Sequence, residues 1–192
     1  MSLSREVYES AIQPHIRVTI LILSALSIGA LQPTVARAQQ AVNITNAPPR
    51  CLDADLGTIN QNGTKVQLWD CWGGDNQKWQ AVTTGGGIFR IKNVQSGRCL
   101  DADLGTINQN GTKVQLWDCW GGDNQNWAWD TAVLPGNTAA SGMFNQGSTI
   151  AGSACRPVLD ADLGTLAHNG TKIQLWECTA GYNQYWINPL PH

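Results

Sequence analysis

The chain has 192 residues, enough for one ordinary domain, and a formal net charge of −2 at pH 7 from 12 basic and 14 acidic residues. No cluster of Lys and Arg occurs along it. This charge pattern argues against a nucleic-acid-binding protein and against a protein drawn to anionic membranes by a polybasic segment.

The first 38 residues differ in composition from the rest and are predicted to be a signal peptide. Arg17 precedes an apolar run of 14 residues, and the segment ends in Ala36-Arg37-Ala38, a small-x-small pattern typical of a signal-peptidase site. The apolar run is shorter than the roughly 20 residues that span a bilayer, which disfavours a transmembrane anchor. We therefore expect a secreted, extracellular protein whose mature chain covers residues 39–192.

A stretch of 28 residues occurs twice without a change, at 50–77 and 98–125, and a drifted copy follows at 158–184. Self-similarity of this kind predicts a repeat architecture. One repeat of this size is too small to bury a core, so the three are expected to share one domain. The expected repeats cover residues of about 39–82, 83–131 and 132–192.

Short alternating runs between turn residues predict an all-β fold with about four short strands in each repeat. In the run 64–69, Val66 and Leu68 should face one way and Gln67 and Trp69 the other. Asn-Gly turns precede this run and its two counterparts, and they are also N-x-S/T glycosylation sequons, which we interpret as turn chemistry. The sequons lie at Asn43, Asn62, Asn110 and Asn169.

The third repeat contains an extra segment, Leu134 to Met143, which is rich in small and turn-forming residues and is expected to be a surface loop.

Six cysteines in an exported chain indicate a disulfide framework. The repeat pattern favours one bridge within each copy, although the first cysteine of the third pair stands three residues earlier than the pattern requires. A metal centre is disfavoured because no C-x-x-C pair or His at ligand spacing occurs. The expected bridges are Cys51–Cys71, Cys99–Cys119 and Cys155–Cys178.

A Gln-x-Trp signature closes each copy, as Gln77-Lys-Trp79, Gln125-Asn-Trp127 and Gln184-Tyr-Trp186. With Cys-Leu-Asp at the start of the first two copies and Val-Gln-Leu-Trp-Asp-Cys in their middle, these motifs closely resemble the ricin B-type lectins over essentially the whole mature chain. The resemblance implies a β-trefoil, which is a six-stranded barrel closed by three hairpins with one repeat per lobe. It also implies binding of galactose-like sugars.

A site for a neutral sugar needs an acceptor for vicinal hydroxyls, an aromatic face and a few amides, and each copy contains this set. In the first copy we assign Asp53 as the acceptor, because carboxylates form strong charge-assisted hydrogen bonds, and Trp69 as the aromatic platform. The resemblance implies that the Gln of Gln-x-Trp steadies the Asp. The predicted carbohydrate-binding residues are Asp53, Gln67, Trp69, Asn76 and Gln77; Asp101, Gln115, Trp117, Asn124 and Gln125; and Asp160, Gln174, Trp176, Asn183 and Gln184.

Other tryptophans are assigned different positions. Large aromatic residues tend to be buried, so we expect the closing Trp79, Trp127 and Trp186 in the core. Trp72 and Trp120 either widen the first two pockets or shield a disulfide, and Thr179 takes their place in the third copy.

The second acid of each Asp-Ala-Asp is expected to be a solvated turn residue at Asp55, Asp103 and Asp162. The oxygen ligands that an EF-hand needs at its fifth and twelfth positions are missing. We also expect the two acids to point to opposite faces, which argues against a glycosidase carboxyl pair. No Ser/His/Asp set occurs. We therefore predict a non-catalytic protein with no metal and no cofactor.

The leading hypothesis is a secreted lectin with up to three galactoside-type sites. One alternative is a β-trefoil inhibitor or protein-interaction module that uses its loops. Another is a subunit that targets a plant-type polysaccharide for a separate glycosidase or toxin.

Overall fold

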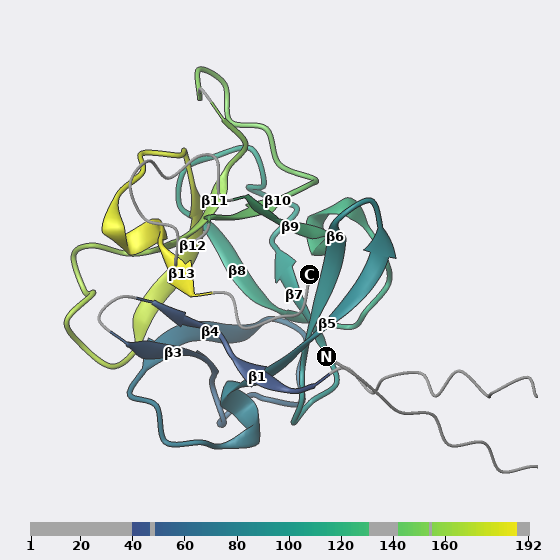
Figure 1. The fold of residues 1–192 in the computed structure, drawn as a ribbon, viewed down its shortest axis with the longest axis vertical. Helices are drawn as coiled ribbons and strands as arrows, with labels where there is room; N and C mark the ends of the chain where they lie inside the picture. The colour runs from purple at the N-terminus through teal and green to yellow at the C-terminus, as the bar shows by residue number, and fades with distance from the viewer. Residues whose placement is uncertain (1–39, 47–48, 131–141, 154, 188–192) are drawn as a thin grey trace, which may run out of the picture. The chain divides into compact units, whose positions relative to one another are not determined.

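The computed structural model describes residues 40–46, 49–130, 142–153 and 155–187, which form short strands and three single-turn 3₁₀ helices (Figure 1). The expected signal peptide and nearly all of the segment from Leu134 to Met143 lie outside the described residues. Within the described ranges, no helix is long and apolar enough to cross a membrane. The elements are β1 (Val42–Asn43), β2 (Thr45–Asn46), β3 (Arg50–Ala54), β4 (Thr64–Trp69), η1 (Asp75–Gln77), β5 (Lys78–Gly85), β6 (Ile88–Asn93), β7 (Cys99–Ala102), β8 (Thr112–Trp117), η2 (Asp123–Gln125), β9 (Trp127–Asp130), β10 (Gly142–Asn145), β11 (Val158–Ala161), β12 (Thr171–Trp176), η3 (Tyr182–Gln184) and β13 (Trp186–Ile187).

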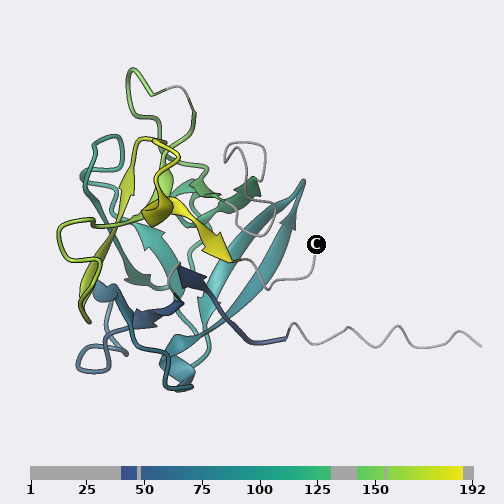
Figure 2. The same ribbon diagram turned by 60° about the vertical axis from the view of Figure 1, so that its left-hand side comes forward.

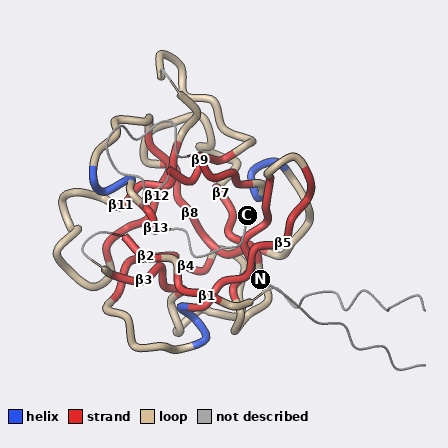
Figure 3. The backbone as a smooth tube through the Cα atoms, in the orientation of Figure 1, coloured by secondary structure: helices blue, strands red, loops and turns tan. Residues whose placement is uncertain are grey.

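The three repeats form three equivalent lobes. Each contains one antiparallel hairpin from its Asp-Ala-Asp strand and its Gln-Leu-Trp strand: β3–β4, β7–β8 and β11–β12. The second strands of these hairpins pair with one another, β4 with β8, β8 with β12 and β12 with β4, so they close a ring. The 3₁₀ helices lie at the outside of this arrangement, well apart from one another (Figure 3). This is a β-trefoil, as the resemblance to the ricin B-type lectins implied, and it has the threefold all-β organisation that the repeat predicted.

A second set of strand pairs completes the lobes. β5 pairs with β6, the longest hairpin of the described chain and drawn in teal in Figure 2, and β9 pairs with β10. In the third lobe the partner of β13 is β2, with Trp186 opposite Asn46. A strand near the start of the described domain therefore completes the last lobe, which brings β2 and β13, from the two ends of the described domain, close together.

The core is threefold as well. Leu52, Leu68 and Trp79 of the first lobe are fully buried, and so are their counterparts in the other two lobes. The indole nitrogen of Trp79 donates to the carbonyl oxygen of Leu52 at 2.9 Å, and Trp127 and Trp186 make the matching bonds. A buried indole N–H needs such an acceptor, since an unmade bond in the interior is costly. The prediction that the closing tryptophans lie in the core is confirmed.

Each lobe carries one disulfide. Cys51 is bonded to Cys71, Cys99 to Cys119, and Cys155 to Cys178. The Cα atoms lie 5.1, 5.1 and 5.9 Å apart, so the third pair is bridged even though its first cysteine is displaced along the chain. Closing loops of this length stabilises each lobe by about 3 kcal/mol in the chain-entropy model.

The Asn-Gly turns hold neighbouring lobes together. Asn62 of the first lobe accepts a hydrogen bond from the Asp118 amide at 2.8 Å and donates to the Asp118 carboxylate at 2.9 Å, and Arg98 donates to both side chains. The turn of the third lobe contacts the first lobe in the same way. Asn110 of the second lobe accepts from the Glu177 amide at 2.7 Å, but Pro157 stands where the other lobes have the arginine.

We expect Asn62→Ala to lower the free energy of unfolding by about 1 kcal/mol or more, because several hydrogen bonds between lobes are lost together. Asn110→Ala should cost less, since that interface lacks the arginine and the carboxylate partner. Urea denaturation of the disulfide-intact protein measures both. Equal losses in the two variants would contradict this account.

Candidate functional site

Each lobe has one pocket beside its Asp-Ala-Asp strand, and the three pockets are built from equivalent residues. Their volumes are about 200, 290 and 250 Å³ in the first, second and third lobe. The first is lined by Asp53, Asp55, Leu56, Gln67, Trp69, Trp72 and Asn76. The second is lined by Asp101, Asp103, Leu104, Gln115, Trp117, Trp120 and Asn124. The third is lined by Asp160, Asp162, Leu163, Gln174, Trp176, Thr179 and Asn183.

The register of the hairpin brings the acceptor and the platform together. Asp53 on β3 lies opposite Gln67 on β4, and the Gln67 amide donates to the Asp53 Oδ1 atom at 3.1 Å. Trp69 follows two residues later on the same face and is 38% exposed, while Leu68 between them is fully buried. The predicted alternation of this strand is confirmed, because side chains two residues apart share a face of a strand.

Two further amides hold the carboxylate from the side of the 3₁₀ helix. Asn76 donates to the Asp53 Oδ2 atom at 2.8 Å, and Gln77 donates to the same atom at 3.0 Å. Among the described residues, Gln67 is the one side chain that donates to the Oδ1 atom, and a carboxylate oxygen can accept two hydrogen bonds. One acceptor position is therefore left for a ligand hydroxyl. The matching bonds in the other lobes measure 2.7 to 3.2 Å.

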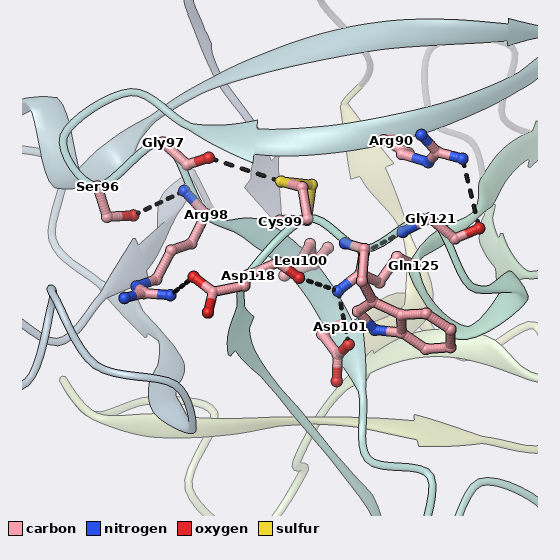
Figure 4. Close-up of a disulfide and its surroundings, with 12 residues drawn as sticks. Arg90, Ser96, Gly97, Arg98, Cys99, Leu100, Asp101, Asp118, Gly121 and Gln125 are labelled. Carbon is pink, nitrogen blue, oxygen red and sulfur yellow. Dashed lines mark hydrogen bonds and ion pairs between the residues drawn. A yellow bond between two sulfur atoms is a disulfide. The ribbon is translucent and has the colours of Figure 1, made fainter.

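The Gln of Gln-x-Trp holds the acid in place and does not line the pocket. Gln125 is fully buried, and its amide nitrogen donates to the Asp101 carboxylate and to the Asp118 carbonyl, both at 2.9 Å (Figure 4). Its Oε1 atom accepts from the backbone amide of Trp120 at 3.1 Å. Gln77 and Gln184 make equivalent bonds. Three of the fifteen predicted site residues are thus positioning residues, and the other twelve line the pockets.

A lectin family model matches this chain over residues 40–142, just over half of its length, and it describes the ricin-type β-trefoil lectin domain. The chain belongs to this family. The family supports a carbohydrate-binding role, as the sequence motifs predicted.

Solved structures show the same fold. The designed threefold-symmetric protein ThreeFoil is 22% identical, with a TM-score of 0.66, over 77% of this chain and 98% of that one. The Macrolepiota procera ricin B-like lectin, solved in complex with lactose, is 22% identical, with a TM-score of 0.62, over 80% of this chain and 96% of that one. The exo-β-1,3-galactanase of Clostridium thermocellum is 24% identical, with a TM-score of 0.67, over 81% of this chain, which spans only 31% of the enzyme.

The prediction that the two acids of Asp-Ala-Asp point to opposite faces is wrong, although the second acid does stand at a turn and is partly exposed. Asp55 lines the same pocket as Asp53, and so do its counterparts in the other lobes. Residues i and i+2 of an extended segment share a face, so the Asp-x-Asp spacing itself carried the signal. The Asp55 carboxylate accepts a hydrogen bond from the Thr58 hydroxyl at 3.0 Å, which fixes its orientation at the pocket edge.

Sequence reasoning also missed the leucine that follows. Leu56, Leu104 and Leu163 line the pockets with side chains that are 50 to 59% exposed. An exposed leucine in an Asp-Leu-Gly turn gives no sequence signal for a pocket wall.

Trp72 and Trp120, for which two roles were open, line the first two pockets. Among the described residues, no group of three or more His, Cys, Asp or Glu side chains is placed to hold a metal ion.

Burial raises the pKa of the three acids. Desolvation raises the pKa of Asp53, Asp101 and Asp160 above the ordinary value of 3.8, and hydrogen bonds from the surrounding amides oppose part of that rise. The folded chain holds the carboxyl protons of these three acids more tightly than the unfolded chain does. Proton binding therefore contributes to the free energy of unfolding in full below the pKa of the unfolded chain, and this contribution is lost as the pH rises through the raised pKa of the folded chain.

We therefore expect the side-chain carboxyl carbons of these three residues to titrate with midpoints above 3.8 in a ¹³C NMR experiment on the folded protein. The physical reason is the removal of water from a carboxylate whose hydrogen-bond donors are all neutral: three amides in each lobe, with the Trp120 side chain as a further donor at Asp101. Midpoints at or below 3.8 would show that the amides outweigh the desolvation.

Proposed function

We propose that the protein is a secreted, non-catalytic lectin that binds galactoside-type sugars at three sites, one in each lobe. The observation that carries the proposal is the threefold recurrence of a buried carboxylate, held by three amides, beside a partly exposed indole. A pyranose that offers vicinal hydroxyls on one edge and a C–H patch on one face fits this pairing. Galactose has both features, and the Macrolepiota procera lectin that shares the fold was solved with lactose, a galactoside.

Secretion is supported by the composition of residues 1–38 and by the three disulfides, because disulfides persist in oxidising compartments. Three sites on one rigid domain also suit a surface that displays many copies of a sugar. Linked sites raise the effective concentration for the second and third contacts, so weak single sites give strong overall binding.

Calorimetric titration with lactose tests the sites. Replacing Asp53, Asp101 and Asp160 together by Ala removes the charge-assisted acceptor from every pocket, and we expect binding to fall by at least about tenfold, or about 1.4 kcal/mol. Binding of equal strength in this variant would refute the proposed site, and absence of binding to the unmodified protein would refute the proposed ligand.

The acids also hold buried amides, so their loss can weaken the fold. The triple variant Trp69→Ala, Trp117→Ala and Trp176→Ala provides a second measurement, because these side chains are partly exposed and hold no buried group in place. It should keep its denaturation midpoint and lose lactose binding by about tenfold or more.

A second candidate is a targeting role on a galactose-containing polysaccharide for a separate enzyme. The galactanase similarity favours it, because the matched part of that enzyme is a fraction of a longer chain. Retention of the protein on insoluble galactan, reversed by free lactose, would support targeting. Binding to lactose without retention on the polymer would contradict it.

A further inference from the structure

The first two pockets differ from the third at one wall. Trp72 and Trp120 line the first two and are 58% and 57% exposed, whereas Thr179 lines the third at the same position. The first two pockets therefore present two indoles each, and the third presents Trp176 alone. The predicted set of binding residues contains neither of these additional tryptophans.

The second indole has a defined place in the fold. Gly73 has a φ of 85°, so the chain turns back after Trp72, and the ring lies directly on the next residue, Gly74. A Cβ atom on Gly74 would stand 2.2 Å from two ring carbons of Trp72, so a side chain at this position would displace the ring. Trp120 lies on Gly122 in the same way. The ring is thus positioned by the backbone.

The same ring lies beside an acceptor that has no partner. The Oδ1 atoms of Asn76 and Asn124 are buried without a hydrogen-bond partner, and these side chains line the two pockets while being 1% and 2% exposed. A buried acceptor left unpaired is unfavourable, and because these two atoms are enclosed by the protein, a ligand hydroxyl does not reach them without a local rearrangement. This acceptor lies on the Trp72 side of the pocket, because the position of a Cβ on Gly74 is 2.6 Å from it.

We infer that the first two lobes recognise a disaccharide or a longer glycan across two rings, while the third recognises a single sugar residue. This inference rests on the proposed function. Trp69, at the end of β4, takes the terminal galactose beside Asp53. Trp72, which comes from the loop before η1, stacks on the neighbouring sugar. Trp72 and Trp120 are then specificity-determining residues.

Single-site proteins test the inference. Trp117→Ala with Trp176→Ala leaves the first lobe intact, and Trp69→Ala with Trp117→Ala leaves the third. Calorimetry gives the affinity of each for lactose and for methyl β-galactoside. For each protein, the quantity compared is the ratio of its affinity for lactose to its affinity for methyl β-galactoside. We expect this ratio to be about threefold to tenfold larger in the first-lobe protein than in the third-lobe protein, because the first lobe adds one aromatic contact.

Exchanging the wall residue gives the matched control. Trp72→Thr in the first-lobe protein should remove the extra preference for lactose over methyl β-galactoside. Thr179→Trp in the third-lobe protein should create the preference, because Gly181 matches Gly74 and Ala180 already has a φ of 55°. A gain of function in the third lobe cannot arise from misfolding.

The outcomes separate this inference from the proposed function. If the unmodified protein binds neither sugar, both are overturned. If it binds galactosides and the four single-site proteins show the same preference, the proposed function stands and the role of the second indole is refuted.

Discussion

The structure depends on one constraint, which is that a carboxylate removed from water must be surrounded by donors. In each lobe the acid is almost fully buried, and its three amide donors come from the opposite strand of the hairpin and from two successive residues of the 3₁₀ helix. The strand register and the 3₁₀ turn are therefore fixed by the same group. The disulfide closes the loop between them. A pocket built this way is preorganised before any ligand arrives.

The same group explains why the pocket has one open side. Gln77 and Asn76 occupy the Oδ2 atom from within the lobe, so ligand hydroxyls can compete only at the Oδ1 atom beside the exposed indole. The Oδ2 atom of the carboxylate is therefore used for hydrogen bonds within the lobe, and the Oδ1 atom faces the ligand pocket. This division accounts for the burial of Gln77 next to a solvent-facing Trp69.

Much of this architecture could be predicted from the sequence because it is local and repeated. The alternation in 64–69, the closing tryptophans and the bridge within each lobe all follow from short-range patterns. The contacts between lobes could not be predicted. Asn62 signals a turn in the sequence, yet its partners Asp118 and Arg98 lie in the next lobe, and only the threefold packing brings them together. The place of Asp55 is different, because residues two apart on an extended chain share a face, so the Asp-x-Asp spacing itself predicts that both acids line one pocket.

The drifted third copy distinguishes the residues that build the lobe from the residues that shape the pocket wall. It keeps the acid, its three amides and the closing tryptophan, so these residues suffice to build a lobe and position a carboxylate. It lacks the arginine that clasps the neighbouring turn, and it replaces the second indole with Thr179. The lobe still folds into the same hairpin with Asp160 opposite Gln174. The wall of the pocket can therefore change without disturbing the acid, which allows one fold to carry sites of different extent.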